Sequence, residues 1–450
     1  MKKILLLCGL ATGVLAAETS DIENALSRAV DYFFSINSHG GYVYFVTPDL
    51  SQRWGESPAD EYTIEVQPPG TPAVGQSFLR VYELTQNETA LQAARDAAFA
   101  LIRGQNDLGG WEHTIHFNRP KRNRVSFDDN QSQSAIRFLM ALDQVMEDDS
   151  LTAAINKALD MMLETQLDNG GWPHRYPRNY DYHDFATFND GGINDCLKVM
   201  LDAYSYYKND EYRISIRRAG WFLLLSQLPP PQPGWAQQYN QYLQPAWARA
   251  FEPPSVCPLV TVRNINTLID LYLYTGDGRY LEPIPDALNW LDDIQLPNGK
   301  WPRFVEIGTG KALYYDRGRI RVNSPEELHI ERSTGYGYET DLSDALSSAR
   351  QRFETVREMG DERYLAEQNR SLSIEEIQAR LEALQPQVEA VLNQLDEQGR
   401  WLTPNDRYKQ HTPGRRWNGE YEVQDRISSH VFNTNIHILC DYLELLRQLE

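Results

Sequence analysis

Apolar residues recur along this chain at the spacing of amphipathic helices, and the helices come in pairs. The first pattern runs from Asp21 to Ile36, with Ala25, Ala29 and Phe33 on one stripe. No segment alternates apolar and polar residues as a half-buried strand does. The sequence therefore predicts an all-α protein, with further helices near 90–103, 133–145, 151–166, 193–207, 212–228, 259–274, 280–294 and 429–449.

Tryptophans that follow glycine turns mark an internal repeat of roughly 60 residues. Trp111, Trp172 and Trp235 are each followed 16 residues later by a phenylalanine that opens a polar loop, namely Phe127, Phe188 and Phe251. Weaker copies of the turn stand at 40–42, 298–302 and 398–401. Long loops on one side and short turns on the other suit helical hairpins in a ring. We expect an α/α toroid of about six to seven hairpins with long loops at one rim. An open superhelix is the alternative.

The first 16 residues are typical of a secretory signal peptide. Lys2 and Lys3 precede an apolar run, and small residues precede a cut near Ala17. The run is too short to span a bilayer. We expect residues 17–450 to form a single domain that is secreted or periplasmic. Within it, the charge-rich stretch 342–397 is interpreted as a solvated helical surface.

Charge and cysteine content exclude several classes of function. The net charge of -20 argues against nucleic acid and anionic membranes as partners, and an anionic ligand would need a local arginine cluster or a metal. Cys196, Cys257 and Cys440 are too few and too scattered for a disulfide framework or a zinc site, so we expect them to be buried. No serine-hydrolase elbow, phosphate-binding loop or dinucleotide fingerprint is present. We expect a monomer.

Two loops at matching repeat positions carry oxygen-rich side chains. Asp129 and Asn130 lie in the first loop, and Asp190 lies in the second. Such oxygens are the ligands of hard cations such as Ca²⁺. The alternative is that these residues cap helix N-termini. His113 and His116 form a His-x-x-His pair, which without further context is a weak metal signal, so a local hydrogen-bonding role or stacking on substrate is favoured.

Arginines gather later in the chain, although the protein is acidic. Arg249 lies in the third loop, and Arg317, Arg319, Arg321 and Arg332 follow within a short stretch. Guanidinium groups bind carboxylates in bidentate fashion, which favours an anionic ligand. The alternative is surface ion pairs with nearby glutamates. The aromatic loop residues suit stacking on a carbohydrate, and we expect the following to touch substrate with Arg175 and Asn130: Trp172, Tyr176, Trp235 and Tyr336.

At these residues the chain resembles the bacterial pectate lyases of polysaccharide lyase family 10, also called pectic acid lyases. The resemblance covers about residues 75 to 340. It leaves 342–450 as an extra C-terminal helical part, and Ser333 stands where the family usually has a second arginine. The matching pieces are 126–130 (SFDDN), 169–177 (NGGWPHRYP), 187–190 (TFND), 234–239 (GWAQQY), 248–254 (ARAFEPP), 303–309 (RFVEIGT), 316–317 (DR) and 331–336 (ERSTGY).

The resemblance implies an α/α-toroid-like enzyme that cleaves α-1,4-polygalacturonate by β-elimination with calcium. It implies that Asp129, Asn130 and Asp190 hold Ca²⁺ or the substrate, and that an arginine is the base. We favour Arg249, with Arg317 and Arg332 on the carboxylates of the substrate, although the assignment among the three stays open. Arg263, a further candidate, lies inside a predicted helix and is interpreted as structural.

An arginine base predicts an alkaline optimum, because the guanidinium must lose a proton to work. Two alternatives of different class remain. A toroid glycoside hydrolase on an acidic polysaccharide would use two carboxylic acids, such as Asp129 and Asp190, or Glu112 or Glu252. A non-catalytic protein would bind the uronate polymer without turning it over.

Overall fold

The computed structural model describes residues 17–411 and 417–449. The predicted signal peptide at 1–16 lies outside these residues. No helix in the described part of the chain combines the length and the hydropathy that crossing a membrane requires. Cys196, Cys257 and Cys440 are buried free thiols, as expected.

Paired helices make up most of the described chain. One helix of each pair lies in an inner layer, and the other helix packs outside it. The inner helices are α2 (Thr71–Thr85), α4 (Gln131–Asp143), α6 (Gly192–Tyr207), α8 (Pro258–Thr275), α11 (Ser343–Met359) and α14 (Ser429–Arg447). The outer helices are α1 (Thr19–Ser35), α3 (Glu88–Gly104), α5 (Asp149–Thr165), α7 (Asp210–Ser226), α9 (Ile284–Asp293) and α13 (Ile374–Gln394).

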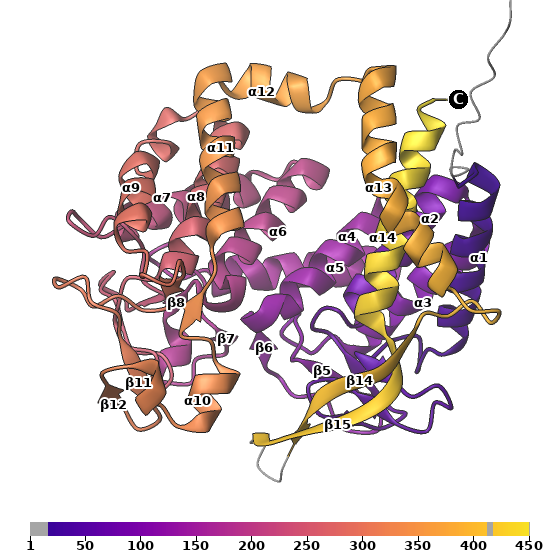
Figure 1. The fold of residues 1–450 in the computed structure, drawn as a ribbon, viewed down its shortest axis with the longest axis horizontal. Coiled ribbons are helices and arrows are strands. Elements are labelled where there is room, and N and C mark those ends of the chain that lie inside the picture. Colours follow the sequence, from indigo (N-terminus) through magenta and orange to yellow (C-terminus); the bar gives the residue numbers. More distant parts are fainter. Residues whose placement is uncertain (1–16, 412–416, 450) are drawn as a thin grey trace, which may run out of the picture.

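The last hairpin of the array packs against the first. Helix α14 contacts α1 and α2. Next to α13, Arg28 Nη2 of α1 donates to the Asp396 carbonyl at 2.5 Å, and a Cβ on Gly399 would lie 2.3 Å from the Arg28 carbonyl oxygen. On the other side, α12 (Asp361–Gln368) leads from α11 across to α13 (Figure 1). The two ends of the array therefore meet, and the predicted α/α toroid is confirmed.

The described residues 342–411 and 417–449 belong to this ring. They supply α11, α13 and α14, so this stretch completes the toroid as its fifth inner helix and its sixth hairpin. The strands of the same segment, β14 (Leu402–His411) and β15 (Trp417–Ser428), lie at the loop rim.

The repeated tryptophans fix each turn to its own outer helix. The indole of Trp172 donates to the Met162 carbonyl at 2.9 Å, and the other copies do the same over a similar sequence distance. The equivalent bonds are Trp111 to Leu101 (2.9 Å), Trp235 to Leu223 (2.8 Å), Trp301 to Leu291 (2.8 Å) and Trp401 to Val391 (2.9 Å). The tryptophan repeat is therefore an architectural device, since a buried indole needs an acceptor.

The same turns join neighbouring hairpins. Gln166 Nε2 donates to the carbonyls of Gly170 (2.9 Å) and Ser215 (3.0 Å), the latter in the next outer helix. Gly170 has a φ of 95°, and a Cβ there would lie 2.2 Å from the Arg218 carbonyl oxygen. Only glycine suits this approach of turn to helix.

The equal spacing of the three phenylalanines breaks down in the third copy. The amide of Ser126 donates to the Trp111 carbonyl, and Thr187 donates to Trp172, but in the third loop the donor to Trp235 is Cys257. Phe251 is therefore not the counterpart of Phe127 and Phe188. It lies on extra residues that lengthen the third loop, and these residues carry Arg249.

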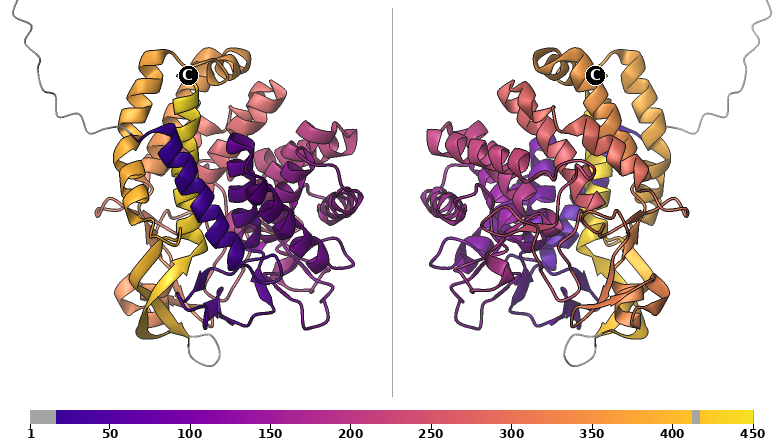
Figure 2. Two further views of the ribbon diagram at one scale, coloured as in Figure 1. Left: turned by 90° about the vertical axis from the view of Figure 1, so that its right-hand side faces the viewer. Right: turned by 90° about the vertical axis from the view of Figure 1, so that its left-hand side faces the viewer.

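Strands occur at one rim, which corrects the expectation of a chain without them. They are short pairs between consecutive loops and one five-stranded sheet, and they lie in the lower half of Figure 1 and at the same end of the molecule in Figure 2. The sheet has the order β14 (Leu402–His411), β15 (Trp417–Ser428), β1 (Phe45–Val46), β2 (Arg53–Trp54), β3 (Pro58–Ala59). The pairs are β4 (Thr63–Glu65) with β5 (Thr114–His116), β6 (Val125–Ser126) with β7 (Arg175–Tyr176), β8 (Ala186–Thr187) with β9 (Gln238–Tyr239), β10 (Trp301–Pro302) with β13 (Glu339–Thr340), and β11 (Tyr314–Asp316) with β12 (Ile320–Val322).

The long hairpin β14–β15 escaped the sequence pattern because both of its faces are largely polar. Apolar side chains that do alternate on β15, such as Tyr421 and Val423, are 42 % and 54 % exposed. A strand is recognised in sequence by one buried face, and these alternating side chains of β15 do not form one.

Candidate active site

Asp129 and Asp190 have the same backbone conformation in two contacting turns. They lie in the 3-10 turns η1 (Asp128–Asn130) and η3 (Asn189–Gly191), which pack against each other. Their φ angles are 46° and 47°, in the left-handed region that non-glycine residues rarely adopt. The turns precede α4 and α6, where no side-chain cap bond forms. Strained backbone at matched positions favours a site over the helix-capping alternative.

The carboxylates in these turns oppose one another's ionisation. Burial, then the charge of Asp190, raises the pKa of Asp129 to about 7. The same two causes raise the pKa of Asp128 to about 6. Asn189 Nδ2 donates to Asp190 Oδ2 at 2.5 Å, which fixes the third carboxylate. Several carboxylates are thus close together in a partly buried place, where their negative charges repel one another. A bound cation would reduce this repulsion.

The donor atoms fit a divalent cation. Asp128 Oδ1 and Asn130 Oδ1 are buried, and neither accepts a hydrogen bond within the described structure. Both are oxygen acceptors, the type of ligand that hard cations prefer. One nitrogen or oxygen atom of each of His113, Asp128 and Asp129 lies within 4.8 Å of the others. Of the predicted ligands, only Asp129 belongs to this group, with Asp128 and His113; Asn130 lies in the same turn, and Asp190 lies in the contacting turn.

A buried glutamate holds Arg249 beside these turns. Arg249 donates to Glu252 through its backbone N (2.9 Å), Nε (2.8 Å) and Nη2 (2.6 Å). The Glu252 side chain is 2 % exposed, whereas that of Arg249 is 42 % exposed. Burial alone would lower the pKa of Arg249, but its bonds to Glu252 raise it above the ordinary value. The buried Glu252 therefore holds the guanidinium in place, while part of the Arg249 side chain remains accessible to a ligand.

Two aromatic rings collect the other arginines. The Phe251 ring faces the guanidinium carbons of Arg332 at 4.2 Å, Arg249 at 5.0 Å and Arg317 at 5.3 Å. The Tyr336 ring faces Arg303 at 4.2 Å and Arg332 at 5.2 Å. The face of an aromatic ring attracts cations, so one ring can hold several guanidinium groups near one another. This clustering differs from the dispersed surface ion pairs of the alternative interpretation.

Tyr336 ties this cluster to the glutamate. Its hydroxyl donates to Glu252 Oε1 at 2.6 Å, and its carbonyl accepts from Arg303 Nη1 at 3.3 Å. Burial, then the charge of Arg317, lowers the pKa of Arg332. The arginines around Glu252 give the cluster a cationic character that suits a carboxylate ligand.

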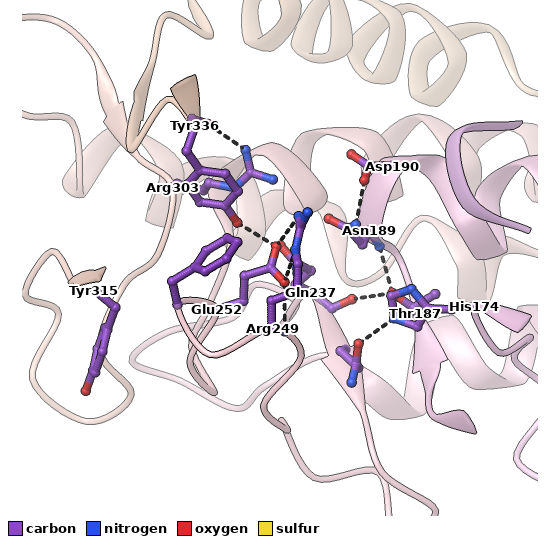
Figure 3. A network of polar contacts seen from close by, with 12 residues as sticks. His174, Thr187, Asn189, Asp190, Gln237, Arg249, Glu252, Arg303, Tyr315 and Tyr336 are labelled. Atoms are coloured by element: carbon purple, nitrogen blue, oxygen red, sulfur yellow. Dashed lines mark hydrogen bonds and ion pairs between the residues drawn. The ribbon is translucent and has the colours of Figure 1, made fainter. Parts of the chain in front are cut away.

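The acidic turns and the arginines lie side by side. Figure 3 shows Arg249 between Glu252 and Tyr336 on one side and Asn189 and Asp190 on the other. The charge of Arg249 also lowers the pKa values of Asp128 and Asp129 against the effects that raise them. The predicted convergence of Asp129, Asp190 and Arg249 on one rim is therefore present.

Other predicted contact residues have different surroundings. Trp172 and Trp235 are 0 % exposed and belong to the core, so neither ring can stack on a sugar, which corrects that expectation. Tyr176 is half-buried, and its hydroxyl donates to Glu164 Oε1 at 2.7 Å. Arg175 pairs across β6–β7 with Ser126, and its charge acts on Asp128. Arg263 lies inside α8, as expected.

Three residues of the site were not assigned a role from the sequence: Asp128, Phe251 and Arg303. Asp128 directly precedes the predicted ligand Asp129, and this adjacency was the sequence feature that could have indicated its role. From the sequence, Glu252 was considered only as a possible acid of a hydrolase. Its ion pair with Arg249 forms within a turn, across a spacing of three residues. His113 gave only the weak His-x-x-His signal.

Comparison with known proteins defines the class. The family model described as pectic acid lyase matches residues 116–260, which include both acidic turns and the Arg249–Glu252 pair. The predicted resemblance is thereby confirmed, and the protein is an enzyme of the polysaccharide lyase class. No curated protein matches the chain in sequence.

Solved structures show the same fold. A family 10 polysaccharide lyase from Cellvibrio cellulosa is 19 % identical over 62 % of this chain and 97 % of its own, with a TM-score of 0.51. A mutant of such a lyase from the same organism, in complex with trigalacturonic acid, is 19 % identical over 64 % of this chain and 98 % of its own, with a TM-score of 0.50. A D-mannose isomerase is 12 % identical over 96 % of this chain and 99 % of its own, with a TM-score of 0.51.

Proposed function

We propose that this protein is a secreted or periplasmic, cation-dependent pectate lyase that cleaves α-1,4-linked polygalacturonate by β-elimination. The observation that carries the proposal is the placing of Arg249 between the carboxylate turns and the arginine cluster (Figure 3). The match to the pectic acid lyase model and the trigalacturonic acid bound to a similar fold support the substrate class.

The acidic turns would hold the cation. Asp128, Asp129, Asn130 and Asp190 supply the oxygens, and calcium is the ion that the family resemblance implies. When bound, a divalent cation would neutralise a uronate carboxylate and so make the neighbouring C5 proton more acidic. Arg317 and Arg332 would hold carboxylates of the polymer, with Phe251 fixing both guanidinium groups.

Arg249 is assigned the role of base. Among the arginines, the charge of Arg249 acts most strongly on Asp128. Its side chain is also open to solvent. In its neutral form it would take the C5 proton, the C–H electron pair would form the C4–C5 double bond, and the C4–O bond would break. Water would then protonate the leaving oxygen. Because Glu252 favours the protonated form of Arg249, an alkaline optimum is expected.

An absorbance assay on polygalacturonate tests the proposal. A lyase yields an unsaturated uronide that absorbs in the ultraviolet, and we expect this signal with added cation and its loss with a chelator. New reducing ends without absorbance would instead indicate a hydrolase. Binding of the polymer without either signal from neutral to alkaline pH would indicate a non-catalytic binding protein.

A further inference from the structure

A histidine from a neighbouring loop reaches the two aspartates of the first turn. His113 precedes β5, and its carbonyl accepts from the Val66 amide at 2.8 Å, which continues the β4–β5 pairing. This pairing fixes the backbone of His113 from outside the acidic turns. One ligand atom each of His113, Asp128 and Asp129 lies within 4.8 Å of the other two.

The unpartnered oxygens of the turn are a separate sign of a missing ligand. Asp128 Oδ1 and Asn130 Oδ1 are enclosed by protein and accept no hydrogen bond within the described residues. Buried polar atoms normally have partners, so such atoms call for an explanation. The amide oxygen of Asn130 and the ionised carboxylate of Asp128 can only accept, which fits a cation better than it fits an anion.

Imidazole changes the kind of cation that this set prefers. Calcium is bound almost entirely by oxygen, whereas imidazole nitrogen is a ligand of first-row transition ions. Two carboxylates with one imidazole form a mixed nitrogen and oxygen set. The acidic turns without His113 would be an ordinary calcium site.

We propose that His113 completes the cation site with Asp128 and Asp129, and that the site binds a first-row divalent ion such as Mn²⁺ in preference to Ca²⁺. The inference rests on the proposed function only for the location of the site. It differs from the family resemblance, which implies calcium.

Metal binding without substrate tests the inference. Chelator-treated protein is titrated with MnCl₂ and, separately, with CaCl₂ by calorimetry, with the melting temperature as a second readout. We expect Mn²⁺ to bind at least about ten-fold more tightly than Ca²⁺, since the imidazole contributes only to the former. An equal or reversed preference in the wild type would overturn the proposal.

Two histidine variants separate ligation from folding. His113→Gln is expected to lose roughly ten-fold or more in affinity for Mn²⁺ while its affinity for Ca²⁺ changes little. His116→Gln is the matched control, because His116 lies three residues further on, in β5, and its ring contacts Thr63 and Thr114 instead. Equal effects of the two variants, or none from His113→Gln, would contradict the assignment.

Electron paramagnetic resonance gives a readout that does not depend on stability. Bound Mn²⁺ should show coupling to a nitrogen nucleus that disappears in His113→Gln, and no such coupling in the wild type would refute the ligation. Lyase activity is measured separately. An inactive protein that still shows selective Mn²⁺ binding would refute the proposed function and leave this site standing.

Discussion

Glu252 binds Arg249 through both of its carboxylate oxygens: Nε of Arg249 donates to Oε2 at 2.8 Å, and Nη2 donates to Oε1 at 2.6 Å. Burial alone would raise the pKa of Glu252, but the bonds from Arg249 lower it to about 2. Glu252 is therefore ionised at neutral pH, and its charge favours the protonated form of Arg249. An arginine held in this way can act as a base only after the attraction of Glu252 is overcome.

Glu252→Gln should move the activity profile to lower pH. The variant removes the charge that raises the pKa of Arg249, so the neutral form of Arg249 becomes available at lower pH. We expect the acid limb of kcat/KM to move down by about one pH unit or more, with roughly ten-fold lower activity at the optimum because one tether weakens.

An exposed pair at the same rim provides the control for this variant. Glu306 contacts Arg321 at 2.5 Å, and Glu306→Gln should leave the profile in place. If the limb does not move in Glu252→Gln, Arg249 is not the base. The role would then pass to Arg332, whose pKa is already lowered by burial and by Arg317.

The parts of this site that are local in sequence were predictable. Asp129 and Asp190 stand in repeated turns, and the repeat itself places them side by side, as the contact of η1 with η3 bears out. The toroid was predictable for the same reason, because each turn, tryptophan and helix pair is specified within its own repeat.

Contacts between distant segments were not predictable in the same way. Tyr336 reaches Glu252 across 84 residues, and no pattern in either segment indicates this bond. Trp172 and Trp235 were misjudged because a conspicuous aromatic residue suits a sugar platform and a core anchor equally well in sequence. The third loop was misaligned because its extra residues happen to place Phe251 at the expected spacing.

Tyr336→Phe should reduce turnover more than binding. The change deletes the hydroxyl that donates to Glu252 but keeps the ring that faces Arg303 and Arg332. A hydrogen bond to a charged group contributes about 1.5–3 kcal/mol, so we expect kcat to fall roughly ten-fold or more with KM little changed. Tyr336→Ala also removes the ring and should raise KM. Steady-state kinetics on polygalacturonate decide, and equal KM increases in both variants would contradict this division.

Asp129→Asn should stabilise the protein in the absence of metal at alkaline pH. The pKa of Asp129 is raised to about 7, so the folded protein holds a proton that the unfolded chain has released above about pH 4. Stability contributed by this proton is present below pH 4 and is lost as the pH rises to about 7. At pH 8 with chelator, we expect the variant to gain about 1–3 kcal/mol over the wild type.

Urea unfolding at pH 4 and pH 8 measures this difference. The two proteins should be nearly equally stable at pH 4, because both carry a neutral side chain at position 129. Added Mn²⁺ or Ca²⁺ at pH 8 should stabilise the wild type and not the variant. A variant that is less stable than the metal-free wild type at pH 8 would show that the carboxylate is not under strain.

Gly170→Ala should destabilise the ring much more than the same change at an equivalent turn. Gly170 and Gly299 both have positive φ, 95° and 81°. A Cβ at Gly170 would lie 2.2 Å from the Arg218 carbonyl oxygen, whereas a Cβ at Gly299 would meet nothing within 4 Å. Alanine at positive φ costs roughly 1–2 kcal/mol at either position, and the collision should add about 2 kcal/mol at Gly170 alone. Chemical unfolding of both variants tests this, and equal losses would mean that the turns do not rely on close contact with the next hairpin.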